Sequence, residues 1–301
     1  MTSMHHLMTS AASQIALIDH HEVAWSEVRE TRYWMHQRFE YHYPGAIRDL
    51  RQRLVVIPPE RYGDQRLCAY DLKISAPDAV TSAITDTFGN RVFTVAIPEL
   101  AGDLAFEMRL VVERDVSAVV WPRVTDGDAA RYLAPTPLTV ADARIVDAAR
   151  HLARRHAGAE ELADAISTWV YGAMRYGYGA TTVSTPAAEA LAVGKGLCQD
   201  YAHIMLAICR AAGIPARYVS GHMLGEGGSH AWVEALVTTA GGYRAVAFDP
   251  TNHRRITPAY ITVATGRDYS DVSPTSGSYR APYQGQFSAS KRAGLTHLAY
   301  R

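Results

Sequence analysis

The sequence predicts an α+β protein in which an antiparallel β-sandwich domain precedes a domain of helices and strands. Two observations predict this class. Short segments rich in β-branched and aromatic residues fill the first third of the chain. Beyond them the apolar period becomes helical, and strand-like segments then return. We expect a mobile or helical leader over 1–30, the sandwich over 31–125, a linker over 126–139, the second domain over 140–290 and a C-terminal tail over 291–301.

The charge balance argues against several classes of partner. Among 301 residues, 30 basic side chains balance 30 acidic ones, and no block of like charge suggests a nucleic-acid or membrane surface. Three cysteines cannot form a disulfide framework, which favours a reducing compartment. The N-terminus lacks the pattern of a signal peptide. We therefore expect a cytoplasmic protein with no nucleic-acid or membrane partner; the oligomeric state stays open.

Four segments predict the strands of the sandwich, and several of them alternate apolar with polar residues. Turn-forming sequences separate them, including "PPERYGD", "DTFGN" and "PELAGD". No cluster of His, Asp or Glu in this part indicates chemistry, so a structural or substrate-presenting role is expected. The four segments are 53–57, 67–74, 91–97 and 104–113.

The second domain begins with helices. Thr139 and Asp142 resemble a capping box before the first one. The second carries apolar residues at helical spacing over 162–173. Thr185 is a plausible N-cap of a third, short helix that ends at Gly194. Strands are then expected over 217–224, 230–237 and 243–250.

Between the third helix and these strands lies "GKGLCQDYAHIMLAICRAAGIP", residues 194–215. Leu197, Tyr201, Ile204 and Ile208 predict an amphipathic helix, which places Cys198 in its first turn. Unpaired N–H groups and the helix dipole at such a position favour a thiolate, the nucleophilic form of cysteine. Cys198 is therefore a candidate nucleophile.

A nucleophilic cysteine needs a base and a group that orients the base. His230 opens one predicted strand and Asp249 ends the next, with "TTAGG" as a hairpin loop between them. If the two residues are directly opposed, their numbers sum to 479 and the chain reverses between residues 239 and 240. Their Cβ atoms would then be roughly 5 Å apart. Asp249 could fix one imidazole nitrogen while the other faces the thiol.

Each of these residues also has a plain structural interpretation. A lone cysteine is usually a small hydrophobe, and we interpret Cys68 and Cys209 in that way. Histidine at a strand start is often a surface residue, and "DP" is often a turn. A structural zinc site from Cys198, His230 and Asp249 would lack a fourth ligand and any C-x-x-C pair. We expect no metal and no cofactor.

Three stretches together resemble the transglutaminase-like superfamily of papain-type thiol enzymes. They are the cysteine stretch itself, "SHAWVEALV" and "VAFDPTN". "GRDYSDVSPTSG" resembles the trailing segment of the bacterial branch, and "YHYPGAIRDLRQRLVVIPP" and "DTFGNRVFTV" are similar to its N-terminal β-domain. The resemblance covers most of residues 33–290. It implies a transglutaminase-like, papain-like core behind the sandwich.

The resemblance also implies roles for particular residues. Cys198 would be the nucleophile, His230 the base and Asp249 its orienting group. The family's second oxyanion donor is an aromatic side chain upstream of the cysteine. Of the four candidates we favour Tyr176, which lies just past a predicted helix. The candidates are Trp169, Tyr171, Tyr176 and Tyr178.

Three further residues lie close to these in the sequence. We interpret Asp200 as a first-turn carboxylate that stabilises the helix N-terminus. Trp232 and Glu234 share the His230 face by strand parity, so they either wall the site or simply pack there.

The expected reaction is acyl transfer through a thioester on Cys198, with a peptide or protein as substrate. Water as the second nucleophile would make the protein a cysteine peptidase or amidase, which we favour because hydrolysis needs no second binding site. An amine would make it a cross-linking or ligating transferase. A catalytically silent binding module is the alternative from a different class, although packing alone does not require Cys, His and Asp together.

Overall fold

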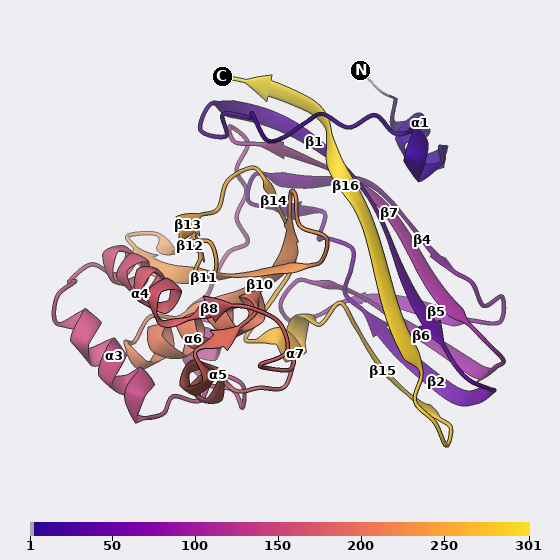
Figure 1. The fold of residues 1–301 in the computed structure, drawn as a ribbon. Helices are drawn as coiled ribbons and strands as arrows, with labels where there is room; N and C mark the ends of the chain where they lie inside the picture. The colour runs from indigo at the N-terminus through magenta and orange to yellow at the C-terminus, as the bar shows by residue number, and fades with distance from the viewer. Residues whose placement is uncertain (1–2) are drawn as a thin grey trace.

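The computed structural model describes residues 3–301, which form a β lobe and a mixed lobe of helices and strands (Figure 1). The helices are α1 (Met4–Thr9), α2 (Asp126–Leu133), α3 (Ala143–Ala153), α4 (Ala159–Ala173), α5 (Ala187–Val193), α6 (Cys198–Ala211) and α7 (Tyr269–Val272), with a 3₁₀ turn at Ala12–Gln14. The strands of the β lobe are β1 (Val28–His42), β2 (Ile47–Leu54), β3 (Arg61–Tyr62), β4 (Gln65–Ile74), β5 (Val80–Thr85), β6 (Arg91–Leu100), β7 (Leu104–Asp115), β15 (Thr275–Arg280) and β16 (Gln286–Tyr300). Those of the mixed lobe are β8 (Arg175–Tyr176), β9 (Lys195–Gly196), β10 (Ala216–Met223), β11 (His230–Thr239), β12 (Gly242–Asp249), β13 (Arg254–Arg255) and β14 (Tyr260–Gly266).

The β lobe is an antiparallel sandwich, as the sequence predicts. One sheet has the order β16-β1-β7-β4-β3 and the other β15-β2-β6-β5. Their facing side chains, among them Phe39, Leu50, Val95 and Phe106, form a common apolar core. Alternation is clear in β2, where Ile47, Leu50, Gln52 and Leu54 are buried among exposed arginines and an aspartate. Inward apolar and outward charged residues thus build the sandwich.

The last residues of the chain belong to this sandwich, which differs from the expected tail over 291–301. Strand β16 pairs antiparallel with β1, from Gln286 opposite His42 to Tyr300 opposite Val28. β15 likewise pairs with β2, so residues from 275 onward leave the mixed lobe. The sequence "QFSASKRAG" has few apolar residues, so its strand signal is weak. Hydrogen bonding to the edge of β1 supplies the order that local propensity does not.

Other boundaries also differ from the sequence prediction. The expected linker contains α2, where Thr125 and Asp128 form a capping box. The predicted strand 53–57 is displaced, because β2 ends at Leu54. Thr139 does not cap α3, whose N-cap is Asp142, and Pro186 takes the N-cap position of α5 that we assigned to Thr185. These shifts of a few residues are common where propensity alone sets an element's end.

The leader is largely docked on the β lobe. Leu7 and Ile15 are buried against Trp34 and Val111, on the outer face of the larger sheet. The Trp34 indole N–H donates to the carbonyl oxygen of Leu7 at 2.7 Å. Residues 1 and 2 of the expected leader lie outside the described residues. Within 3–301, the structure has no helix that is long and apolar enough to cross a membrane.

The mixed lobe has the expected helices packed on an antiparallel sheet. Its strand order is β13-β12-β11-β10-β14. Helix α6 is buried from Asp200 to Arg210 and lies between the sheet and α3, α4 and α5. Its many apolar residues pack on both the sheet and the helices, which makes this helix central. Its N-terminus, at Cys198, lies two residues before this buried stretch.

Side-chain amides hold the two lobes together. β14 is an edge strand, and its free edge meets Gln65 and Asn90 of the β lobe. Each amide both donates to and accepts from the main chain, Gln65 at Thr262 and Asn90 at Thr265, over 2.8–2.9 Å. They satisfy backbone groups that an edge strand otherwise leaves open.

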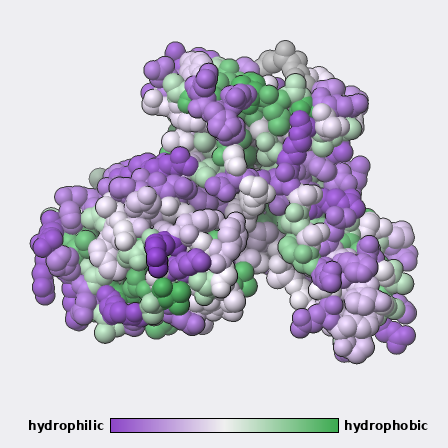
Figure 2. All heavy atoms as spheres, viewed as in Figure 1, coloured by the Kyte–Doolittle hydropathy of each residue, from purple (hydrophilic) through white to green (hydrophobic). Residues whose placement is uncertain are grey.

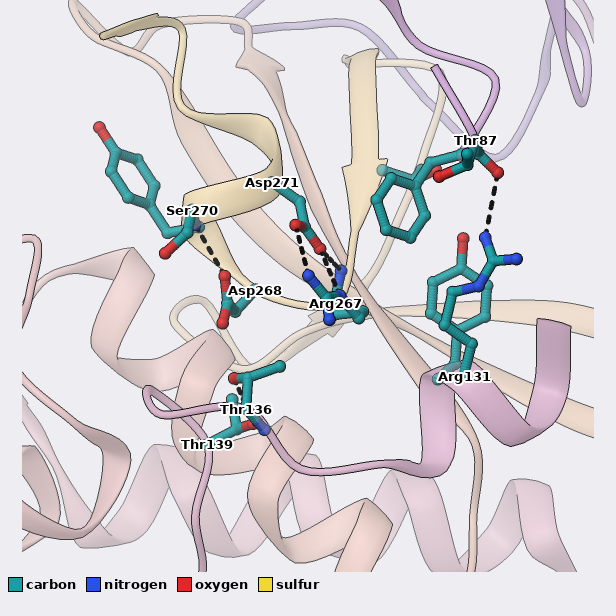
Figure 3. Close-up of polar contacts among 12 residues, drawn as sticks. Thr87, Arg131, Thr136, Thr139, Arg267, Asp268, Ser270 and Asp271 are labelled. Carbon is teal, nitrogen blue, oxygen red and sulfur yellow. Dashed lines mark hydrogen bonds and ion pairs between the residues drawn. The ribbon is translucent and has the colours of Figure 1, made fainter. Parts of the chain in front are cut away.

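Charged contacts add to this junction. Figure 3 shows Arg131 of α2 pointing to the main-chain oxygen of Thr87, and Arg267 paired with Asp271 beyond β14. Buried Glu234 accepts the Tyr62 hydroxyl at 2.5 Å and Arg217 Nε at 2.7 Å. Below this junction the lobes stand apart and leave a recess between them (Figure 2).

Candidate active site

Cys198 is the first residue of α6 and is half-buried. The chain reaches it through β9, which pairs in parallel with β8, so that Tyr176 lies beside Gly196. Gly194 makes the preceding turn in the left-handed region, at φ 67°. The cysteine therefore sits where the free N–H groups of a helix point outward.

Asp200 fixes the geometry of this approach. Its Oδ2 accepts the Leu197 N–H at 2.7 Å and the Thr181 hydroxyl at 2.7 Å. Gly196 is required here because a Cβ on it would lie 2.7 Å from Cγ of Asp200. Burial raises the pKa of Asp200, although these hydrogen bonds oppose the shift. The G-x-C-x-D pattern is therefore one packing unit that presents the thiol, in line with the role expected for Asp200.

His230, the first residue of β11, connects the thiol to a carboxylate. Its Nε2 lies 2.8 Å from Oδ2 of Asp249, and Cys198 is the second group that favours its charged form. Burial disfavours the charged imidazole, but the hydrogen bonds to Asp249 and Cys198, with their charges, outweigh it and raise the pKa of His230 to about 9. The Trp232 ring stacks at 6.2 Å from the imidazole. Asp249 and the Trp232 ring thus orient the imidazole.

Asp249 is fully buried and held by several donors. Oδ1 accepts the N–H groups of Thr251 and Asn252 at 3.0 and 3.2 Å. Oδ2 accepts the Asn252 amide at 2.8 Å and the Tyr260 hydroxyl at 2.7 Å, besides the imidazole. Burial favours the neutral acid, yet these partners together lower the pKa of Asp249. An ionised carboxylate therefore faces the imidazole.

The register of the hairpin differs from the predicted one. Thr239 pairs with Gly242 and Val233 with Phe248, so paired numbers sum to 481 rather than 479. The reversal lies one residue later, at Ala240 and Gly241. His230 and Asp249 are consequently diagonal neighbours rather than directly opposed. A shift of two in the sum preserves the face on which each residue lies, so the two side chains still meet.

The four aromatic candidates for a second oxyanion donor lie in different surroundings. Tyr176 is 51% exposed, and burial together with the nearby Cys198 raises its pKa. Tyr178 is 75% exposed and meets Tyr176 edge to face. Trp169 packs against the helical core, and Tyr171 stacks on His253. Among the four, Tyr176 is the one whose strand, β8, pairs with the segment that leads into Cys198.

Trp232 and Glu234 have separate roles. Trp232 walls the imidazole and covers Gly221, where a Cβ would collide with its ring. Glu234 forms the interlobe cluster with Tyr62 and Arg217, so it does not wall the site.

Tyr260 and Asn252 were missed by sequence reasoning. Asn252 could have been found, because "DPTN" places an amide three residues after the aspartate, where side chains cap turns. Tyr260 has no such spacing signal.

Metal ligands do not explain the central cluster. Among residues 3–301, Asp19, His20 and His21 are the group whose ligand atoms lie within 4.8 Å of one another, in the leader. Asp19 and His21 are exposed and His20 is half-buried. In the central cluster, Oδ2 of Asp249 already accepts three hydrogen bonds. This arrangement suits a hydrogen-bonded relay better than a zinc site.

Two family models match the chain. The model described as the transglutaminase-like superfamily matches residues 147–250, which contain Cys198, His230 and Asp249. The model described as the bacterial transglutaminase-like N-terminal region matches residues 33–113. This chain belongs to the transglutaminase-like superfamily. The matched regions coincide with the main parts of the mixed lobe and the β lobe.

Relatives and a solved structure agree with this assignment. An uncharacterized protein of Mycobacterium leprae is 35% identical over 182 residues, which cover 56% of this chain and 63% of that protein. An uncharacterized protein of Mycobacterium bovis is 30% identical and covers 82% of this chain and 87% of its own length. A candidate cysteine protease from Cytophaga hutchinsonii shares the fold with a TM-score of 0.73, at 20% identity over 91% of this transglutaminase-like chain and 94% of its own.

Proposed function

We propose that this transglutaminase-like protein is a thiol-dependent acyl-transfer enzyme, and that it acts as a cysteine peptidase or amidase. One observation supports this most strongly. The imidazole of His230 is hydrogen-bonded to the buried carboxylate of Asp249, and both Asp249 and the helix-terminal Cys198 raise its pKa. Nucleophile, base and orienting group in this order are the elements of triad chemistry.

Each side chain has a step that suits its position. His230 receives the thiol proton, and the Cys198 sulfur attacks the amide carbonyl. The Cys198 backbone N–H, at the helix N-terminus, donates to the developing oxyanion, and the Tyr176 hydroxyl is the proposed second donor. His230 then protonates the leaving amine. A water molecule, deprotonated by His230, attacks the thioester and releases the acid.

The raised pKa of His230 suits its role as an acid. At neutral pH the imidazole is charged, because Asp249 and Cys198 outweigh the cost of burial. A charged imidazole can give its proton to the leaving amine without prior uptake from water. Asp249, with its lowered pKa, stays ionised and stabilises the positive ring.

The second nucleophile decides between hydrolysis and cross-linking. An amine acceptor would need its own binding site next to the thioester, whereas water needs none. We therefore favour hydrolysis, with a protein-glutamine cross-linking transferase as the alternative. A silent binding module has less support, because the buried Asp249 and its five hydrogen bonds serve no packing need.

The test is to trap the acyl-enzyme. Wild-type protein would be mixed with a peptide library and quenched in acid, and the mass added to Cys198 would be located by peptide mapping. Addition of glycine methyl ester then reports the acceptor, since hydrolysis yields free acids and transamidation yields amides. Cys68→Ala is the matched control and should behave as wild type. The absence of both acyl-enzyme and products, with Cys198 intact, would contradict the proposal.

A further inference from the structure

A cavity of about 250 Å³ lies between the two lobes. The mixed lobe contributes part of β10 and the loop that leads into β11, including Gly221 and Ser229. The β lobe contributes Phe39 of β1 and, from the C-terminal strand β16, Phe287 and Ala289. Segments nearly 250 residues apart in sequence thus meet around one space. Its volume suits one side chain better than a whole small ligand, for which roughly 300–1,000 Å³ is usual.

Two wall residues are direct neighbours of His230. Ser229 precedes His230 in the chain, and Gly221 pairs with His230 in the β10–β11 ladder. Tyr269, another wall residue, packs edge to face on Tyr218 of β10, at 6.4 Å. The cavity therefore borders the candidate base, His230.

The lining carries no ionised side chain. Apolar groups form much of the wall, among them Phe39, Val56 and Val263, and no Asp, Glu, Lys or Arg contributes to it. One histidine, His222, lines the cavity. Burial, and then the charge of Lys291, lower the pKa of His222 to about 3, so its imidazole is neutral at neutral pH. A charged guest would lose its hydration here and would meet no ion-pair partner among the lining side chains. An apolar guest would gain from burial.

The wall is fixed in place by the C-terminal strand. Lys291 of β16 donates from Nζ to the carbonyl oxygen of Gly228, in the loop before His230, and lies 3.4 Å from Nδ1 of His222. In the ladder, Lys291 is opposite Gln37 and Ala289 is opposite Phe39, so both face the mixed lobe. This contact sets the distance between β16 and the loop, so the cavity is formed before any substrate arrives.

We propose that this cavity receives an uncharged, apolar side chain of the peptide substrate next to the scissile bond. The inference rests on the acyl-transfer function proposed above and adds its specificity. The β lobe and its C-terminal strand are then part of the binding site rather than a separate structural domain. Substrates that carry Asp, Glu, Lys or Arg where the side chain would enter the cavity should therefore react with a lower kcat/KM.

The test fills the cavity from the exposed side of β16. Ala289→Trp places an indole toward Phe39, and because Ala289 is exposed the substitution should leave the core intact. Ser288→Trp is the matched control, since Ser288 is opposite Glu40 on the other face of the same strand and does not line the cavity. Cleavage of a peptide library by each variant would be mapped by mass spectrometry, with residues read on both sides of the cut.

The wild type should prefer Leu, Phe, Met or Val at one position beside the cut over Gly, Asp or Lys. Ala289→Trp should lower kcat/KM for the large apolar residues at least tenfold and leave Gly and Ala substrates within about twofold. Ser288→Trp should match the wild type. Cleavage without such a preference, or equal effects of both substitutions, would overturn the cavity's role while leaving the acyl-transfer function standing.

A wild-type protein that cleaves no peptide would speak against hydrolysis, and a second measurement then decides on the cavity. Peptidyl chloromethyl ketones that differ only in Leu or Gly would be compared by the rate at which they alkylate Cys198. Faster labelling by the Leu reagent, lost in Ala289→Trp and kept in Ser288→Trp, supports the cavity. Equal rates for the two reagents in the wild type overturn it.

Discussion

The hydroxyl of Tyr260 donates to Oδ2 of Asp249 at 2.7 Å, and the same oxygen accepts Nε2 of His230 at 2.8 Å. Tyr260 opens β14, which is separated by β10 from the hairpin that carries His230 and Asp249. Its ring also packs against His230, with centroids 5.9 Å apart. Tyr260, on the edge strand β14, thus positions the Asp249 carboxylate, and this carboxylate in turn orients the His230 imidazole.

Tyr260→Phe should weaken catalysis without dismantling the site. The ring remains, but Asp249 loses a donor that lowers its pKa, so the acid limb of the pH–rate profile should move to higher pH. A lost hydrogen bond of about 1 kcal/mol corresponds to about a fivefold fall in kcat. Steady-state kinetics from pH 4 to 9 would check both effects. Tyr243→Phe, at the far end of β12, should change neither the rate nor the profile.

The paired histidine should make stability depend on pH. The pKa of His230 is about 9 in the folded protein and 6.5 in the unfolded chain. The stabilisation from its partners is therefore fully present below pH 6.5 and is lost as pH rises through about 9. A difference of about 2.5 in pKa corresponds to about 3 kcal/mol of unfolding free energy. Urea unfolding at pH 6 and pH 9.5 should show this loss in the wild type and not in His230→Gln; equal losses would contradict the pairing.

Gly196→Ala should disturb the presentation of the thiol. The new methyl group would press on the Asp200 carboxylate and break its contact with the Leu197 N–H. We expect a loss of about 1–3 kcal/mol in stability, as for an overpacked core site, and slower alkylation of Cys198. Gly172→Ala in α4 is the control, because open space surrounds that position. It should be neutral or stabilise by up to about 1 kcal/mol. Similar effects at both glycines would refute the packing argument.

Tyr176→Phe tests the second oxyanion donor. Loss of one preorganised donor should lower kcat by roughly 10²–10³-fold, whereas alkylation of Cys198 by iodoacetamide should stay unchanged because no oxyanion forms there. Tyr178→Phe, its exposed neighbour, should retain wild-type turnover. If the two phenylalanine variants have the same kcat, Tyr176 is not the donor.

Much of the fold could be predicted from residue patterns because local signals agreed with the final structure. Alternating β-branched residues form β4, β6 and β7 close to the predicted bounds, and the apolar face predicts α6. β16 was not predicted, because this segment becomes a strand by pairing with the distant strand β1 and its own residues favour a strand only weakly. Sequence carries no local signal for such contacts.

In the candidate site too, residues with a local sequence signal were predicted, and residues placed by contacts with distant strands were not. Cys198, His230 and Asp249 each lie at the end of an element, which the sequence makes visible. The hairpin register was predicted wrongly because "TTAGG" admits reversals that differ by one residue. Tyr260 depends on how β14 is placed across the sheet, which no spacing encodes.

The most direct test of the central claim is the alkylation rate of each cysteine against pH, in the wild type and in His230→Ala. Burial raises the pKa of Cys68 to about 11 and of Cys209 to about 12, so both serve as slow internal references. Peptide mass spectrometry resolves the three sites. We expect Cys198 to be labelled far faster than the other two at pH 6, and His230→Ala to remove most of this advantage. The same Cys198 profile in both proteins would contradict a His230-paired nucleophile.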